Sequence, residues 1–185
     1  MQPVVPEDGM QIAVDTVFEP GVYYLPKGVQ VDAGVTLDGG GALLFGAARQ
    51  GAGVTISGSG ATIKNLKLRE YYHGLRATEA SGIRIAHCDI HGTAELPPND
   101  MFLDIWRGPE ESYGAAMYLA GVSDSTIEEN DLQHNMNGLV AYGCSGLQVR
   151  GNVCSYCSGF GIYLSASSEG TFVENCCDYC CRFQP

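Results

Sequence analysis

Apolar residues recur along most of the chain at a spacing of 22 to 23 residues. The clearest series consists of Ile63, Ile85, Ile127, Val149 and Phe172. Two further series keep the same phase, namely Leu68, Ile90, Leu132, Cys154 and Cys177, and then Leu75, Met117, Leu139 and Ile162. Three short apolar segments per repeat, with glycines between them and no room for a helix, predict a solenoid of parallel β-strands whose coils bury their apolar faces by stacking.

One step in each series is 42 residues long, which corresponds to one coil plus an insertion of 20 residues. The second and third series are seven residues apart at Leu132 and Leu139 but 27 apart at Ile90 and Met117. We therefore place a loop insertion at residues 93–112. A β-sandwich with coincidentally spaced strands is the alternative, but sandwiches repeat their turns without residue-for-residue register.

The two ends of the chain lack this regularity. Residues 1–20 contain three prolines without a sustained period. We expect them to cap the first edge of the coil, because an open strand edge would template further pairing. Residues 21–185 then form the solenoid, and the chain stops within a coil just after Cys181. We expect this end to be open, as in a fragment of a longer solenoid, or to be covered by a second copy.

Composition agrees with an all-β chain and narrows its partners. The chain has 185 residues, of which 25 are glycine and 45% are hydrophobic, as suits one domain with many corners. No stretch resembles a membrane span, so we expect no membrane anchor. No cationic leader precedes an apolar core, so we expect a secretory signal to be absent or already removed. A net charge of -11 argues against nucleic acid, and against polyanionic sugars unless a cation or a basic patch intervenes.

Three features resemble the right-handed parallel β-helix proteins of the pectate lyase-like superfamily. They are the Val-Thr-Leu-Asp-Gly-Gly-Gly segment at residues 35–41, the repeated Ile-x-x-Asn step, and the Gly-Ile or Gly-Leu strand openings. The resemblance covers residues 21–181 and implies a right-handed, single-stranded parallel β-helix. It also implies a sugar-binding groove on the first sheet and a secreted or periplasmic location. It does not settle the activity, because a fold does not determine chemistry.

Proteins of that superfamily carry an asparagine ladder in the turn between the second and third strands of each coil. Asn130, Asn152 and Asn175 are similar in place. Their side chains would bond to backbone groups and to one another along the stack, and a polar substrate site is the less favoured alternative. The equivalent positions in earlier coils are Leu66 and Cys88, so the ladder would be absent there.

By the same correspondence, the series that starts at Leu75 lies in the first sheet. Alternation along a strand then turns two columns outward, Arg76, Tyr118, Val140 and Tyr163, and Thr78, Ala120, Tyr142 and Ser165. We interpret four of these as a substrate-binding face on which rings stack on sugars: Arg76, Tyr118, Tyr142 and Tyr163. The alternative of equal weight is the ordinary preference of tyrosine for strand surfaces.

The insertion supplies further candidates beside this face, because long loops next to a rigid sheet often carry function. Trp106 and Tyr113 would form one wall of the groove, and Asp100 or Asp104 would offer a carboxylate. We expect Trp106 and Arg107 to bind substrate. The neighbouring apolar residues are better explained as a small hydrophobic plug between solvated turns.

The catalytic residues, if there are any, stay open. A glycoside hydrolase needs two carboxylates at a fixed separation, and the outward columns offer none. A polysaccharide lyase needs a base near the substrate and a cation that holds the uronate. His73 and Arg76 are candidates for these roles, but the sequence places no aspartate cluster for calcium beside them. Asp104 is a third candidate catalytic residue. We interpret His91 and His134 as surface or turn residues, the usual role of a lone histidine.

Seven of the eight cysteines follow residue 143, and Cys154-x-x-Cys157 with Cys177-x-x-Cys180 has the spacing of a zinc ribbon. The register favours another interpretation. Cys154 and Cys177 continue the apolar series, so they would stack about 4.8 Å apart inside the coil as a thiol ladder. The other two thiols would stack likewise instead of converging on a tetrahedral centre. We therefore expect no cofactor and no metal site, with zinc or calcium as the alternative.

Two functions fit these observations. The first is a carbohydrate-binding or polysaccharide-processing β-helix, lyase-like or hydrolase-like, with a polysaccharide or oligosaccharide in its groove. The second is a non-catalytic structural or assembly scaffold that associates with itself through the open C-terminal coil. Neither involves nucleic acid or a membrane.

Overall fold

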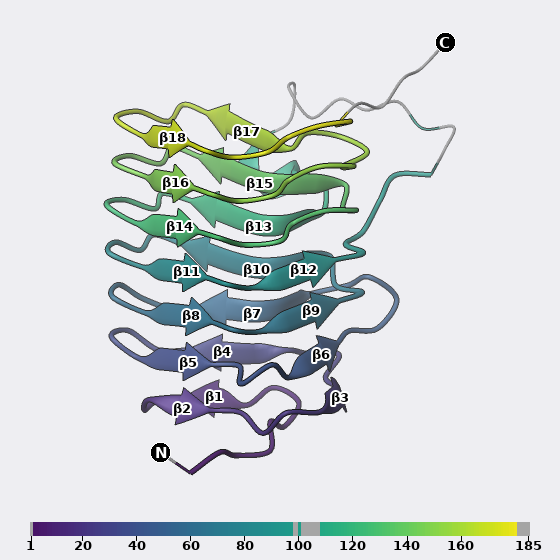
Figure 1. Ribbon diagram of the computed structural model, residues 1–185, viewed down its shortest axis with the longest axis vertical. Helices are drawn as coiled ribbons and strands as arrows, with labels where there is room; N and C mark the ends of the chain where they lie inside the picture. The colour runs from purple at the N-terminus through teal and green to yellow at the C-terminus, as the bar shows by residue number, and fades with distance from the viewer. Residues whose placement is uncertain (1, 98–99, 101–107, 181–185) are drawn as a thin grey trace.

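The computed structural model describes residues 2–97, 100 and 108–180, and these form a coil of three parallel sheets (Figure 1). The first sheet runs, in spatial order, β1 (Gln11–Ile12), β4 (Val29–Val31), β7 (Ala52–Ile56), β10 (His73–Thr78), β13 (Ala115–Ala120), β15 (Asn137–Tyr142) and β17 (Ile162–Ser165). The second contains β2 (Thr16–Val17), β5 (Thr36–Asp38), β8 (Thr62–Lys64), β11 (Arg84–Ala86), β14 (Thr126–Glu128), β16 (Gln148–Arg150) and β18 (Thr171–Val173). The third contains β3 (Val22–Tyr24), β6 (Leu43–Phe45), β9 (Lys67–Arg69) and β12 (Asp89–His91).

The strand pairing follows the register expected from the repeat. In the second sheet Ile85 pairs with Ile63 on one side and Ile127 on the other. In the first sheet Met117 lies between Leu75 and Leu139, across the 42-residue step. The predicted all-β parallel solenoid is thereby confirmed, and the residues one lap apart are vertical neighbours.

The core is a continuous column of aliphatic side chains inside the coil. Leu37, Ile63, Ile85 and Ile127 are fully buried, and each stacks on the next. Burying such side chains contributes about 1.5 to 3 kcal/mol each, which is the main force that holds successive coils together.

The corner between the second and third sheets has the same backbone shape in successive coils. Residues Asn65, His87, Glu129 and Glu174 all have φ between 53° and 57° there, which is the left-handed region. Asn130 follows Glu129, Asn175 follows Glu174, and Asn152 follows Gly151, whose φ of 63° lies in the same region. Asn130 donates to the side-chain oxygen of Asn152 at 2.8 Å, and Asn152 donates to that of Asn175 at 3.0 Å.

The segment 1–20 differs from the expected cap, because it already contains β1 and β2 of the first coil. These strands have two residues each, too few for a period to show in the sequence. Val4 in addition forms a parallel bridge with Phe18. The segment thus covers the lower edge by being a coil itself.

The cysteines follow the predicted stacking only in part. Cys154 and Cys157 are buried, and the Cys180 thiol donates to the backbone oxygen of Cys154 at 2.9 Å. Cys177, expected in the apolar interior, is exposed, because it lies in the last coil that the structure describes. A hydrogen bond with Cys154 lowers the pKa of the Cys177 thiol.

The insertion leaves the coil after β12 and returns through a short 3-10 helix, η2 (Pro109–Glu111). Of the residues predicted to lie in it, Asp104, Trp106 and Arg107 fall outside the described part of the chain. None of the helical segments that the structure describes is long and apolar enough to cross a membrane.

Candidate functional site

A groove of about 640 Å³ lies where the returning arm of the insertion crosses the first sheet. Its floor consists of β7 and β10, which contribute Ala52, Thr55, His73 and Arg76. Its wall consists of Pro109, Glu110, Glu111 and Ser112. Tyr72 and Tyr118 also line it.

Two tyrosine hydroxyls fasten the wall to the floor. Tyr118 on β13 donates to the backbone oxygen of Pro109 at 2.9 Å. Tyr72, just before β10, donates to the backbone oxygen of Ser112 at 2.9 Å. The position of the wall is therefore set by hydrogen bonds to the rigid sheet.

A break in the strand alternation brings His73 and Arg76 to the same face, although they are three residues apart. A Cβ on Gly74 would point inward and come within 2.1 Å of a methyl group of Ile90. Leu75 also points inward, as a fully buried member of the core. Two consecutive inward positions turn both His73 and Arg76 outward, which strict alternation does not allow.

His73 is packed between aromatic rings. Its ring centroid lies 4.8 Å from that of Tyr72, edge to face, and 4.8 Å from that of Tyr118. Burial, reinforced by the Arg76 cation, lowers the pKa of His73 to about 3. Its Nδ1 atom is buried and has no hydrogen-bond partner among the described residues. The imidazole is thus neutral near pH 7.

Arg76 is the cation of the groove. Its guanidinium carbon lies 5.5 Å from the ring centroid of Tyr118, in the range of a cation–π interaction. Its side chain is exposed, so its donors can reach a ligand. Burial raises the pKa of the Tyr118 hydroxyl even though the same cation opposes this change, so Tyr118 remains a hydrogen-bond donor.

The tyrosines predicted to form an open sugar-stacking face are mostly covered. Tyr118 and Tyr142 are only 3% and 5% exposed to solvent. With Val140 and Ala115 they make a small apolar cluster on the outer side of the sheet, and half-buried Tyr163 packs against its edge. Alternation places these rings on the correct side of the sheet, but the predicted exposure of Tyr118 and Tyr142 is wrong because this outer face has a hydrophobic layer of its own.

The groove therefore gathers only part of the predicted site. His73, Arg76 and Tyr118 line it, whereas Tyr142 and Tyr163 do not. Glu110, Glu111 and Tyr72 line it as well, and the sequence reasoning missed them. Nothing periodic marks the two glutamates, since they belong to the insertion. Tyr72 carried a signal, because it directly precedes a strand of the first sheet.

These observations define the class of protein: a solenoid of parallel β-strands that carries a groove on its first sheet. Residues 39–183 match a family described as a right handed beta helix region. Since that match spans well over half of the chain, the chain belongs to the right-handed β-helix family. The resemblance inferred from the sequence is confirmed. No curated protein and no solved structure matches the chain.

Proposed function

We propose that this β-helix binds carbohydrate, with a hydroxyl-rich sugar unit of a polysaccharide or oligosaccharide in the groove over β7 and β10. The observation that carries the proposal is the joint presence of Arg76, Glu110 and Glu111 beside the half-buried ring of Tyr72 in one groove. A sugar hydroxyl can accept a hydrogen bond from arginine and donate one to a carboxylate. The apolar face of a sugar ring can pack against an aromatic ring.

The charges of the groove favour a neutral sugar. Arg76 supplies one positive charge, and Glu110 and Glu111 supply two negative charges, so these three side chains sum to -1. The chain as a whole carries -11. A uronate would meet this negative field, whereas a neutral sugar would not.

The geometry favours binding over chemistry. A general base works best with a pKa near the working pH, and the pKa of His73 lies at about 3. Glycoside hydrolysis uses two carboxylates that flank the scissile bond, but Glu110 and Glu111 are consecutive residues on one wall. We expect no unsaturated product and no new reducing ends when the protein is incubated with a polysaccharide that it binds.

The proposal is tested by titration calorimetry against soluble neutral glucans, mannans and xylans, with polygalacturonate as the acidic comparison. We expect saturable binding to a neutral polymer, weakened about tenfold or more in Arg76→Ala and in Glu110→Gln, since each removes hydrogen bonds to a charged group. Lys67→Ala is the matched control, because it removes an exposed cation from the third sheet. Absence of binding to every polymer, or equal binding by Arg76→Ala, would overturn it.

An assembly role is the second candidate, favoured by the surface of the last described coil. β17 and β18 are the outermost described strands of their sheets, and Leu164 and Val173 on them are 43% and 44% exposed. Apolar side chains beside open strand edges favour pairing with another copy. Light scattering during size-exclusion chromatography would show a mass that rises with concentration and falls in Leu164→Glu; a constant monomer mass would exclude this role.

A further inference from the structure

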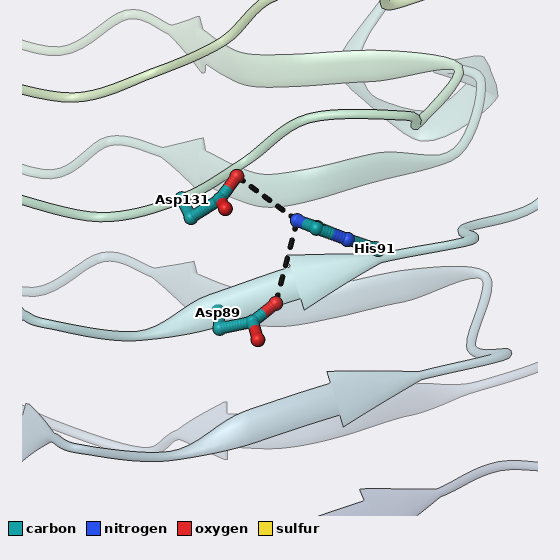
Figure 2. A group of neighbouring side chains, drawn as sticks. All are labelled: Asp89, His91 and Asp131. Carbon is teal, nitrogen blue, oxygen red and sulfur yellow. Dashed lines mark hydrogen bonds and ion pairs between the residues drawn. The ribbon is translucent and has the colours of Figure 1, made fainter.

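Asp89, His91 and Asp131 gather on the third sheet, outside the groove. Figure 2 shows the two carboxylates pointing at the same imidazole nitrogen from neighbouring coils. His91 Nε2 lies 2.9 Å from Asp131 Oδ1 and 3.3 Å from Asp89 Oδ1. One ligand atom from each residue lies within 4.8 Å of the other two.

The coil itself creates this arrangement. Asp89 and His91 are two residues apart on β12, so they point to the same side, and Ile90 between them points into the core. Asp131 forms a parallel bridge with Asp89 from the next coil. Three potential ligands are thus fixed by adjacent rungs, and their side chains are 24% to 42% exposed, which leaves a path for a small ion.

The charges of this cluster are not balanced by the protein. The Arg69 guanidinium lies 2.7 Å from Asp89 Oδ1 and offsets one carboxylate. The second carboxylate, on Asp131, accepts hydrogen bonds from the side chain and the backbone of Gln133 at 3.0 and 3.2 Å, which orient it without neutralising it. With a neutral His91 the sum is -1. A single proton on Nε2 can be directed well at only one of the two carboxylates.

We propose that Asp89, His91 and Asp131 bind a divalent metal ion through one imidazole nitrogen and two carboxylate oxygens. Metal bonds of about 2.0 to 2.2 Å to nitrogen and oxygen place adjacent ligand atoms about 2.8 to 3.1 Å apart in octahedral geometry and about 3.3 to 3.6 Å apart in tetrahedral geometry, so about 2.8 to 3.6 Å over the two. The two separations from Nε2 fall in that range. Gln133 and Arg69 then act as the outer partners that orient the ligands.

The site would clamp β12 to the next coil at the point where the insertion leaves the helix. His91 is the last residue of β12, and the insertion follows it. A bound ion would therefore tie the root of the insertion to Asp131, one lap later. This role is independent of sugar binding.

Mn²⁺ is the probe of choice, because carboxylates and imidazole bind it while the thiols of the cysteine-rich coils favour softer ions. Titration followed by the electron paramagnetic resonance signal of free Mn²⁺ should show one bound ion per chain. His91→Ala and Asp131→Asn should each raise Kd by more than about tenfold, since even loss of an outer partner costs about 10- to 100-fold. The midpoint of thermal unfolding should rise with Mn²⁺ in the natural protein but not in His91→Ala or Asp131→Asn.

His87→Asn is the matched control. His87 also faces a carboxylate, since its Nδ1 lies 3.3 Å from Glu129 Oε2, and asparagine tolerates the left-handed backbone at that position. This variant should bind Mn²⁺ as the natural protein does. Absence of saturable Mn²⁺ binding, or undiminished binding by a folded His91→Ala or Asp131→Asn, would overturn the proposal. Asp131→Asn keeps the side-chain shape, so it serves as the test if His91→Ala does not fold.

Discussion

Asn130 donates its side-chain amide to the side-chain oxygen of Asn152, 22 residues later, at 2.8 Å. The same oxygen accepts the backbone N–H of Asn130 at 3.0 Å, and the Asn152 amide donates to the backbone of Ile127. Both asparagines are at most 2% exposed. One side chain therefore satisfies backbone groups of its neighbours at a corner where the strands cannot.

Replacement of this asparagine should destabilise the fold. Asn152→Ala leaves the Asn130 N–H and the Ile127 carbonyl buried without their partners. Each such group costs about 1 to 3 kcal/mol. Urea unfolding should show this loss, whereas Gln148→Ala, an exposed change in the same coil, should stay close to the natural protein. Equal stability of the two variants would contradict the structural role of the asparagines.

The Glu128 carboxylate should make the free energy of unfolding fall more steeply as the pH is lowered. It forms ion pairs with Arg150 and Arg84 from the coils on either side, and its side chain is 5% exposed. The hydrogen bond from Arg150 is the main cause that holds the pKa of Glu128 below 4.5, against the opposing effect of burial. Because the folded-state pKa is lowered, the stabilisation is complete above pH 4.5 and disappears as the pH falls through the lowered value.

Thermal unfolding at several pH values would measure this effect. Glu128→Gln should lose about 1 to 3 kcal/mol at neutral pH, and the gap from the natural protein should close in acid. Glu129→Gln is the adjacent control, since that side chain is 63% exposed. A gap that stays constant with pH would show that the charge of Glu128 is not the cause.

Gly74 should not tolerate a side chain. A Cβ there would lie 2.1 Å from an Ile90 methyl and 2.7 Å from the backbone oxygen of Ala116, and the backbone cannot move aside. Overpacking of a core typically costs about 1 to 3 kcal/mol. Gly74→Ala should lower the unfolding midpoint and disturb the outward placement of His73, while Gly108→Ala, with open space around its Cβ, should be silent. A fully stable Gly74→Ala would contradict the inward turn at this residue.

His73 should make the protein less stable as the pH falls from 6.5 toward 3. The pKa of His73 falls from 6.5 to about 3 on folding, so in that window the unfolded chain takes up a proton that the folded chain refuses. One proton corresponds to about 1.4 kcal/mol per pH unit. His73→Phe keeps the ring contacts and should flatten the stability profile between pH 6 and about 4. An unchanged slope in this variant would show that the imidazole is not held neutral.

The pairing of strands could be predicted from the sequence because the interior of a solenoid imposes a strict period. Ile85 and Ile127 had to be vertical neighbours once the 42-residue step was divided into a coil and an insertion. The same register also predicts part of the cluster on the third sheet. Ile90 and Leu132 are equivalent positions in successive coils, so the residues before them, Asp89 and Asp131, must be vertical neighbours.

The groove could be predicted only in outline. Alternation states on which side of a sheet Tyr118 lies, but not what covers it, and the outer apolar layer has no periodic signature. The placement of His73 depends on two consecutive inward residues, which alternation forbids. Glu110 reaches the groove through an aperiodic loop whose path is set by single hydrogen bonds to Tyr72 and Tyr118.

The NMR signal of the His73 imidazole is the most direct probe of the proposed groove, because the ring lies in its floor. A neutral oligosaccharide that binds the protein should shift this signal in a saturable way, with the same Kd as calorimetry gives. The His87 imidazole, on the corner after the second sheet, should not move. If the oligosaccharide binds while the His73 signal stays in place, the sugar lies elsewhere on the helix and the account of the groove is wrong.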